Sequence, residues 1–272
     1  MSINMGLRPI ALMTDFGPRD PFVGIMKGVI LGINSSATIV DLCHELKPGD
    51  VRAAAFALAM AFPYLPEGTI FTVVVDPGVG AGRRGIAAEI DGRVFVGPDN
   101  GLLSWVLKNQ AVRRAVKLEN AEFFLSEVSD TFHGRDVFAP VAAHLSKGMP
   151  LETLGPAIED LVTFPIPEVV VGDRSLQGEV VYIDLFGNLL TNITRQEFEG
   201  WRKKLSGETL KIHLGSVEIQ GISRTYGDVP PGHVAAVFGS AGVLEVAVNG
   251  DDAAEMLGAS IGSHVLIYHL PG

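Results

Sequence analysis

Four residues in three polar clusters have side-chain types that could activate and orient a nucleophile. Asp76 and Arg83 stand seven residues apart in the glycine-rich stretch VDPGVGAGRRG, His133 lies in FHGRD, and Asp15 lies in TDFG. A carboxylate can fix a guanidinium through paired hydrogen bonds. A histidine side chain, whose pKa lies near neutral pH, can receive or relay a proton. We therefore expect these side chains to converge at the ends of neighbouring strands.

The glycine-rich stretch also contains a G-x-G-x-x-G pattern, formed by Gly80, Gly82 and Gly85. Dinucleotide binding requires a helix directly after these glycines. The following residues, IAAEIDGRVFVG, instead predict a β-hairpin around Asp91-Gly92. The sequence thus disfavours an NAD-dependent oxidoreductase, while a plain glycine-rich turn with a solvated arginine pair stays open. Patterns typical of serine hydrolases, zinc proteases and Walker-type nucleotidases do not occur.

A further polar loop, DLFGN, lies between two apolar runs and spans Asp184 to Asn188. Its composition fits a ligand-binding loop and fits a simple turn equally well. Elsewhere in the sequence, His144 falls on a predicted helix, and we interpret this histidine as structural.

Composition narrows the class of protein. The 21 basic and 31 acidic residues give a net charge of −10, which argues against nucleic-acid or anionic-membrane partners and is compatible with a cationic small ligand. Cys43 is the single cysteine, so no internal disulfide and no cysteine-ligated metal site are expected. The first residues do not resemble a signal peptide, and we expect a cytoplasmic protein.

The apolar pattern predicts alternating strands and helices in the first part of the chain. Strands are expected at Pro9–Met13, Ala37–Leu42 and Thr69–Val75, and helices at Phe22–Ile33, Val51–Phe62 (with Asp50 as N-cap), from Asn100 to Leu107, and at Phe138–Lys147. Such alternation is typical of a mostly parallel sheet in an α/β fold.

The pattern changes after the proline-bearing stretch FPIPEVVVGDR. Helical periodicity nearly disappears there, and short apolar runs follow one another up to HVLIYHL. We therefore predict an N-terminal α/β domain over residues 1–167 and a smaller, mostly antiparallel β domain over residues 176–272.

Six segments, in the same order and spanning nearly the whole chain, closely resemble the S-adenosyl-L-methionine (SAM) hydroxide adenosyltransferases, relatives of the SAM-dependent fluorinases and chlorinases. The segments are LMTDFG, VVVDPGVGAGRR, FVGPDNGLLSWV, FHGRD, YIDLFGN and FGSAGVLEVAVN. The resemblance implies a three-layer α/β domain, a β-barrel-like C-terminal domain, and a homotrimer with active sites between subunits. It also implies SAM as substrate, with no cofactor and no metal.

The resemblance implies a role for each matching residue. The reactive set falls on Asp76, Arg83 and His133, and Asp15 matches the carboxylate that binds the ribose diol. The remaining substrate-binding positions fall in the predicted C-terminal domain, with Asp184 suited to the methionine ammonium and Val248 acting through its backbone; they are Asp184, Asn188, Ser240, Glu245 and Val248.

The implied reaction is attack of water at C5′ of SAM, which releases adenosine and L-methionine. Sulfonium is already a good leaving group, so the protein chiefly has to position the water. Arg83 stays protonated and can hold the water but cannot act as base, and His133 is the better candidate for taking the proton. The halogenases lack the DPGVGxxRR loop, which favours water over halide. A SAM-dependent halogenase and a non-catalytic adenosine or SAM sensor remain the alternatives.

Overall fold

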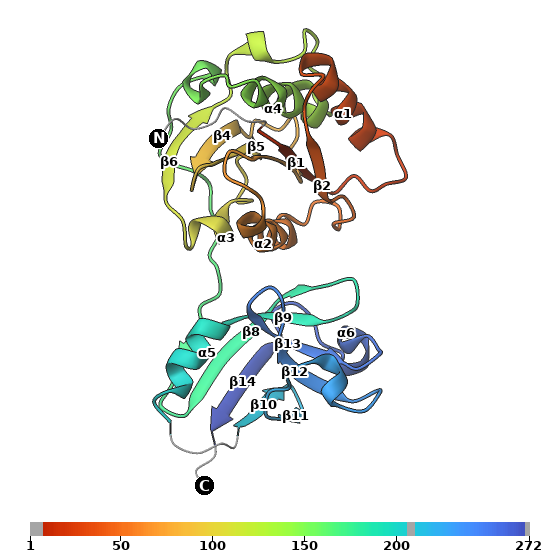
Figure 1. Cartoon of the computed structure of the whole chain (residues 1–272), viewed down its shortest axis with the longest axis vertical. Helices are drawn as coiled ribbons and strands as arrows, with labels where there is room; N and C mark the ends of the chain where they lie inside the picture. The colour runs from red at the N-terminus through yellow and green to blue at the C-terminus, as the bar shows by residue number, and fades with distance from the viewer. Residues whose placement is uncertain (1–7, 206–209, 270–272) are drawn as a thin grey trace. The chain divides into compact units, whose positions relative to one another are not determined.

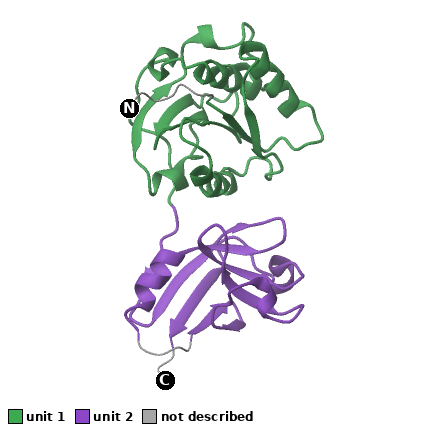
Figure 2. Cartoon of the chain, in the orientation of Figure 1, with its two compact units in different colours: residues 1–165 green, residues 166–272 purple. Residues whose placement is uncertain are grey.

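The chain forms two compact units, residues 1–165 and residues 166–272 (Figure 2). The structure is a computed structural model that describes residues 8–205 and 210–269. The start of the N-terminal segment and the last three residues of the predicted β domain therefore lie outside the described residues. No helix in the described part of the chain is long and apolar enough to cross a lipid bilayer.

The first unit is built on a six-stranded sheet with the strand order β2-β1-β3-β5-β4-β6. The first four strands in this order run parallel, and β4 and β6 run antiparallel to their neighbours. The strands are β1 (Ile10–Thr14), β2 (Ile39–Cys43), β3 (Ile70–Val74), β4 (Gly85–Ile90), β5 (Arg93–Pro98) and β6 (Val112–Lys117). Every residue of β1 and β3 is buried, as expected for central parallel strands covered on both faces.

Helices cover both faces of this sheet, which confirms the predicted three-layer arrangement. Helices α1 (Phe22–Ile33) and α4 (Ala139–Ser146) pack on one face, and α2 (Val51–Ala61) and α3 (Ser104–Leu107) pack on the other (Figure 1). A separate apolar cluster fills each interface between helices and sheet. Single 3₁₀ turns complete the unit at Phe62–Tyr64, Ala121–Phe123 and Leu151–Leu154.

Local signals predicted several elements of this unit well. Helix α1 has the predicted bounds, and Asp50 caps α2 by accepting a hydrogen bond from the Ala53 amide at 2.9 Å. The hairpin between β4 and β5 turns at Asp91-Gly92, and both residues have positive φ, as this type of turn requires. The helix predicted from Asn100 is wrong in length, because a turn with Gly101 at φ 101° delays its start to Ser104. Strand β6 was not predicted.

The second unit is an antiparallel sheet that curls toward a barrel, which confirms the predicted barrel-like fold. Its strands are β7 (Val170–Val171), β8 (Ser175–Ile183), β9 (Leu189–Thr194), β10 (Leu210–Leu214), β11 (Val217–Gln220), β12 (Val234–Phe238), β13 (Val243–Val248) and β14 (His264–His269). The first half of β8 pairs with β14 and the second half with β9, so the long strand belongs to both sides. Beyond β11, the Ser223 amide donates to the Ala236 carbonyl of β12 at 2.8 Å and nearly closes the sheet.

Two short helices in this unit were not predicted, α5 (Arg195–Arg202) and α6 (Ala253–Leu257). Helix α5 begins with a capping box in which the side chains of Thr194 and Glu197 each accept from the other residue's backbone amide. Trp201 anchors the helix in the core, since its side chain is buried and its indole N–H donates to the Gly172 carbonyl at 3.1 Å.

Candidate active site

Asp76, Arg83 and His133 form one continuous hydrogen-bonded chain in the first unit. Arg83 Nε donates to Asp76 Oδ1 and Oδ2 at 3.0 and 2.9 Å, and Arg83 Nη2 also donates to Oδ2. The same Nη2 lies 2.8 Å from His133 Nδ1. The side chains of Asp76 and Arg83 are only 5% and 14% exposed, so bulk water screens their ion pair weakly.

The fold explains why these residues meet. Strands β1 and β3 are parallel neighbours in which Thr14 pairs with Val74, so Asp15 and Asp76 leave the sheet at the same edge. His133 directly precedes a π-helical turn, Gly134–Phe138, that leads into α4. π-Helical turns inside helices often mark functional sites, because they redirect one side chain.

Gly80 lets the loop that carries Asp76 and Arg83 lie against the segment before His133. Its φ is +72°, and a Cβ placed there would collide with the backbone carbonyl oxygen of Asp130. Only glycine combines this backbone conformation with so close an approach. The glycine-rich stretch is therefore a structural requirement for bringing Arg83 to His133.

A cavity of about 580 Å³ and another of about 520 Å³ flank this chain of side chains. We call the smaller one the front cavity. Asp15, Asp76 and His133 all line it, together with three phenylalanine rings, Phe16, Phe22 and Phe132. These rings contact one another edge to face, with centroids 5.3 to 5.9 Å apart. The front cavity thus combines the Asp15 carboxylate, which has no cationic partner among the described residues, with an aromatic wall, and this pairing suits a cationic ligand.

His133 is held as a neutral hydrogen-bond donor. Arginine has no acceptor, so Arg83 must donate to His133 Nδ1, and the neutral ring then carries its proton on Nε2. Burial and the adjacent Arg83 charge lower the pKa of His133 below its ordinary value. In this arrangement neither ring nitrogen has a free lone pair. His133 can therefore accept a proton only if Arg83 releases Nδ1, which weakens its expected part as proton acceptor.

The Asp15 carboxylate has one oxygen engaged by the protein. Asp15 Oδ2 accepts a hydrogen bond from the Gly49 amide at 2.7 Å. No described residue donates to Oδ1, which therefore offers its lone pairs to the front cavity. A diol would thus meet one fully available oxygen and one shared oxygen.

In the second unit, Asp184 shapes the loop between β8 and β9. Its Oδ1 accepts from the Phe186 and Asn188 amides, both at 2.9 Å, and its Oδ2 accepts from Asn188 Nδ2 at 2.8 Å. These contacts make a closed turn with Leu185 and Phe186 exposed at its tip. Asp184 therefore acts as a turn-forming residue as well as a candidate ligand for an ammonium group.

Glu245 is a buried carboxyl on β13 beside the same loop. It accepts a hydrogen bond of 2.6 Å from the Tyr226 hydroxyl, and burial raises the pKa of Glu245. The charge of nearby Asp184 raises this pKa further. Burial and Glu245 also raise the pKa of Tyr226, so its hydroxyl remains a donor.

Asn188 and Val248 line a third cavity, of about 510 Å³, in the second unit. Tyr226 and Asp251 line it too, so the Asp184 loop, Glu245 and this cavity form one region. Ser240 lies in the turn between β12 and β13, next to Gly239, where a Cβ would collide with the Glu245 carboxylate. The structure thus brings Asp184, Asn188, Glu245 and Val248 into one region of the second unit, whereas Ser240 lies in the turn at the other end of β13 from Val248.

Sequence reasoning missed the aromatic wall and Tyr226. Phe16 and Phe132 directly neighbour Asp15 and His133 in the chain, and this adjacency was an available signal. No signal in the sequence indicated Tyr226, because its role depends on its contact with Glu245, 19 residues further along the chain.

Comparison with known proteins identifies related chains. Residues 10–155 match the SAM hydroxide adenosyltransferase N-terminal domain, and residues 178–266 match the C-terminal domain of the same family. A Thermus thermophilus protein named (R)-S-adenosyl-L-methionine hydrolase is 42% identical, over 95% of this chain and 99% of its own length. A Salinispora tropica protein of the same name is 39% identical over 95% and 97%. A Nocardia brasiliensis fluorinase is more distant, at 33% over 92% and 93%.

Solved structures agree with these sequence matches. The crystal structure of an uncharacterized conserved protein from Thermotoga maritima superposes with a TM-score of 0.88 at 38% identity, covering 96% of this chain and all of that one. A conserved hypothetical protein from Thermus thermophilus gives a TM-score of 0.78 at 40% identity, with the same coverage. With both family domains matched in order and relatives about 40% identical along nearly the full length, the chain belongs to the SAM hydroxide adenosyltransferase family.

Proposed function

We propose that this protein hydrolyses (R)-S-adenosyl-L-methionine to adenosine and L-methionine. The observation that carries the proposal is the hydrogen-bonded chain of Asp76, Arg83 and His133 at the wall of a cavity that also holds Asp15. The relatives at 39 to 42% identity carry the hydrolase name, which specifies the R configuration at sulfur. The aromatic wall of the front cavity suits the sulfonium cation.

In the proposed reaction, a water oxygen attacks C5′ in line with the bond from C5′ to sulfur. That bond breaks, and its electron pair goes to sulfur, which becomes the neutral thioether of methionine. The attacking water loses one proton, and adenosine keeps the new hydroxyl. The leaving group needs no protonation, so catalysis consists of positioning water and substrate and excluding competing solvent.

Hydrogen bonds support the roles that we assign to Asp76, Arg83 and His133 in this proposal. Asp76 fixes the Arg83 guanidinium, whose Nη1 donates to no described residue and is available to hold the water by its lone pairs. His133 contributes its Nε2–H as a second donor that orients the nucleophile. Asp15 binds the ribose hydroxyls. For the rest of the substrate, the family resemblance supports Asp184, Asn188, Ser240, Glu245 and the Val248 backbone as the binding residues.

The decisive experiment incubates the purified protein with the R and S epimers of SAM separately, with and without halide, and resolves the products by chromatography. Adenosine and methionine from the R epimer in halide-free buffer are the expected products. A 5′-halogenated adenosine would instead identify a halogenase, the activity for which the fluorinase relatives are named. Measurable SAM binding without turnover would identify a sensor.

We further propose that the reaction requires no cofactor or metal ion, because the sulfonium substrate already carries its leaving group. Activity should therefore persist after dialysis against a chelator such as EDTA, and a loss of activity that a divalent cation restores would contradict this.

We also propose that the protein is a cytoplasmic homotrimer with active sites at subunit boundaries, as the family resemblance implies.

A further inference from the structure

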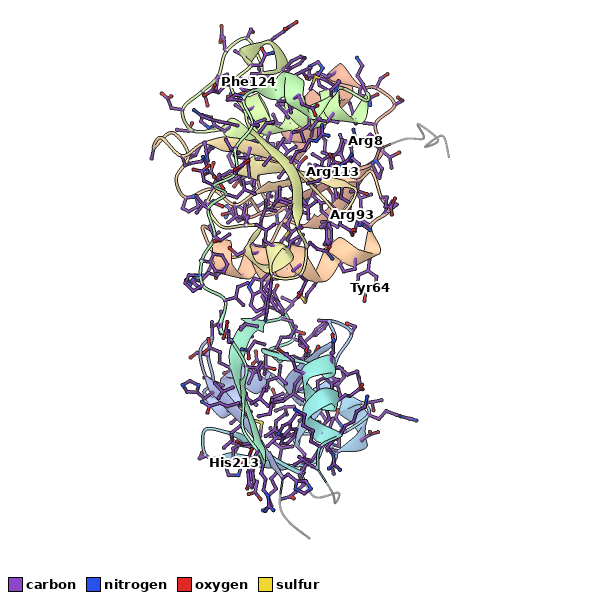
Figure 3. The ribbon with its side chains drawn as sticks, turned by 90° about the vertical axis from the view of Figure 1, so that its left-hand side faces the viewer. Arg8, Tyr64, Arg93, Arg113, Phe124 and His213 are labelled. Atoms are coloured by element: carbon purple, nitrogen blue, oxygen red, sulfur yellow. The ribbon has the colours of Figure 1, made fainter. Side chains whose placement is uncertain are left out.

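The second cavity beside the active-site chain has no assigned role. We call it the rear cavity. It has a volume of about 580 Å³, and its lining includes Arg83, Arg84, Lys117, Phe124, Val128 and His133. Phe124, labelled in Figure 3, contributes to its apolar part. His133 is the one residue that lines both the front and the rear cavity, so the two adjoin at this residue.

The three side chains of the active-site chain are divided between the two cavities. Asp76 lines the front cavity and not the rear one, whereas Arg83 lines the rear cavity and not the front one. The Arg83 Nη1 group has no acceptor among the described residues. Arg83, the residue best suited to hold the nucleophilic water, therefore lines the rear cavity, while the carboxylate Asp15, which we propose binds substrate, lines the front one.

The charges around the rear cavity do not make it an anion site. Arg84 donates to Asp99 at 2.5 Å and to Asp160 at 2.9 Å, and Lys117 pairs with Glu119 at 2.5 Å. Arg83 is neutralised by Asp76. Each cation thus already has its carboxylate. What remains is a space whose cations are all paired and which has room for several waters, each of which occupies about 30 Å³ in the liquid.

We propose that the rear cavity is the water chamber of this enzyme, which supplies the nucleophile past Arg83 and His133 and takes up the released proton. The inference rests on the proposed hydrolase function. A substrate that fills the front cavity shuts out solvent on that side, so the attacking water must enter from elsewhere. Its oxygen forms the new bond to C5′, the C5′–sulfur bond breaks toward sulfur, and its proton passes to chamber water and leaves as hydronium.

Val128 offers a way to fill this chamber without touching the active-site chain. It lines the rear cavity, is 45% exposed and precedes His133 by five residues. Val162 is a matched control in the same unit, 46% exposed and outside the described cavities. Each is replaced by cysteine, and the folded protein is then labelled with a benzyl methanethiosulfonate. Labelling after folding removes the risk that a bulky side chain prevents folding. The native Cys43 is present in both variants, so any label on it affects both equally.

The experiment measures single-turnover SAM hydrolysis and SAM affinity for both variants, with labelling confirmed by mass spectrometry. Labelled Val128→Cys should hydrolyse bound SAM about ten-fold more slowly than labelled Val162→Cys, with unchanged affinity, because displaced or misplaced water slows only the chemical step. Reduction with dithiothreitol should restore the rate.

Two results would overturn the water chamber. Equal rates for the two labelled variants would show that the cavity does not supply water. A loss of SAM affinity in step with the rate would make the cavity part of the substrate pocket. Failure of the unmodified protein to hydrolyse SAM would instead reject the proposed function, so the two failures are distinguishable.

Discussion

At the level of single residues, one hydrogen bond determines what His133 can do. Because Arg83 is a permanent donor, the Nδ1 of His133 is an acceptor, and the ring is useful only while neutral. Protonation would place two cations side by side and break this contact. The nearby carboxylates Asp76, Asp136 and Asp130 favour the protonated ring, yet burial and Arg83 outweigh them.

A pH profile follows from this argument. Since the pKa of His133 is lowered below 6.5, the neutral ring persists into mildly acidic solution, and kcat should fall only as the pH drops through that lowered pKa. In His133→Asn, the side-chain oxygen can replace Nδ1 as acceptor but does not titrate. This variant should have a lower kcat at pH 8, and its pH profile should lack the acidic limb, the fall in kcat at low pH. An unchanged acidic limb in the variant would assign the titration to another group.

Asp15 should control binding rather than chemistry. Asp15→Asn keeps one oxygen to accept from the Gly49 amide but removes the charge that strengthens hydrogen bonds to the ribose. Such bonds contribute about 1.5 to 3 kcal/mol, so KM should rise roughly ten- to hundred-fold. Steady-state kinetics should show kcat nearly unchanged, and a fall in kcat with constant KM would contradict the assignment.

At the level of elements, the loop between β3 and β4 acts as a precise spacer. Asp76 and Arg83 stand near its two ends, and Gly80 packs on the Asp130 backbone between them. Loop conformation, more than helix or strand geometry, therefore determines the distance between Arg83 and His133.

Gly80→Ala tests this spacer directly, with Gly82→Ala as its control. Both glycines have positive φ, so alanine strains the backbone at either position by roughly 1–2 kcal/mol. Only at position 80 does the new Cβ collide with another segment, whereas at position 82 it meets nothing within 4 Å. Gly80→Ala should thus lower kcat about a hundred-fold and lower Tm more than Gly82→Ala. Equal effects of the two substitutions in kinetics and thermal unfolding would show that strain alone matters.

At the level of the whole molecule, the candidate residues divide between the two units. Asp15, Asp76, Arg83 and His133 belong to residues 1–165, and the other five belong to residues 166–272. Each unit has its own apolar core and its own cavities. In the trimer that we propose, a site at a subunit boundary would take the first set from one subunit and the second set from its neighbour.

Subunit complementation tests that assembly. Arg83→Ala and Asn188→Ala should each be nearly inactive as pure proteins. If every site takes Arg83 from one subunit and Asn188 from its neighbour, a mixture refolded at equal amounts should regain activity at about a quarter of its sites. Light scattering gives the oligomeric state of the same samples. Sites contained within one subunit would produce no recovery on mixing.

Local interactions let the sequence alone predict much of this protein. The apolar spacing of α1, the Asp50 cap of α2 and the Asp91-Gly92 hairpin depend on neighbours in the chain, and the structure confirms them. The hairpin prediction also correctly excluded the helix that dinucleotide binding requires after Gly85. Helix α5 was missed although its capping box was readable, because the surrounding runs resembled strands.

How the candidate active-site residues contact one another depends on packing between distant segments of the chain. The spacing of Asp76 and Arg83 suggested their pairing, but the neutral, donor form of His133 depends on a contact across 50 residues. The two cavities that adjoin at His133, and the Tyr226 partner of buried Glu245, likewise arise from packing between distant segments. Residue types and local spacing determine which elements form and which chemistry is available. Burial and long-range contacts determine the protonation states, the free donors and the spaces in which that chemistry takes place.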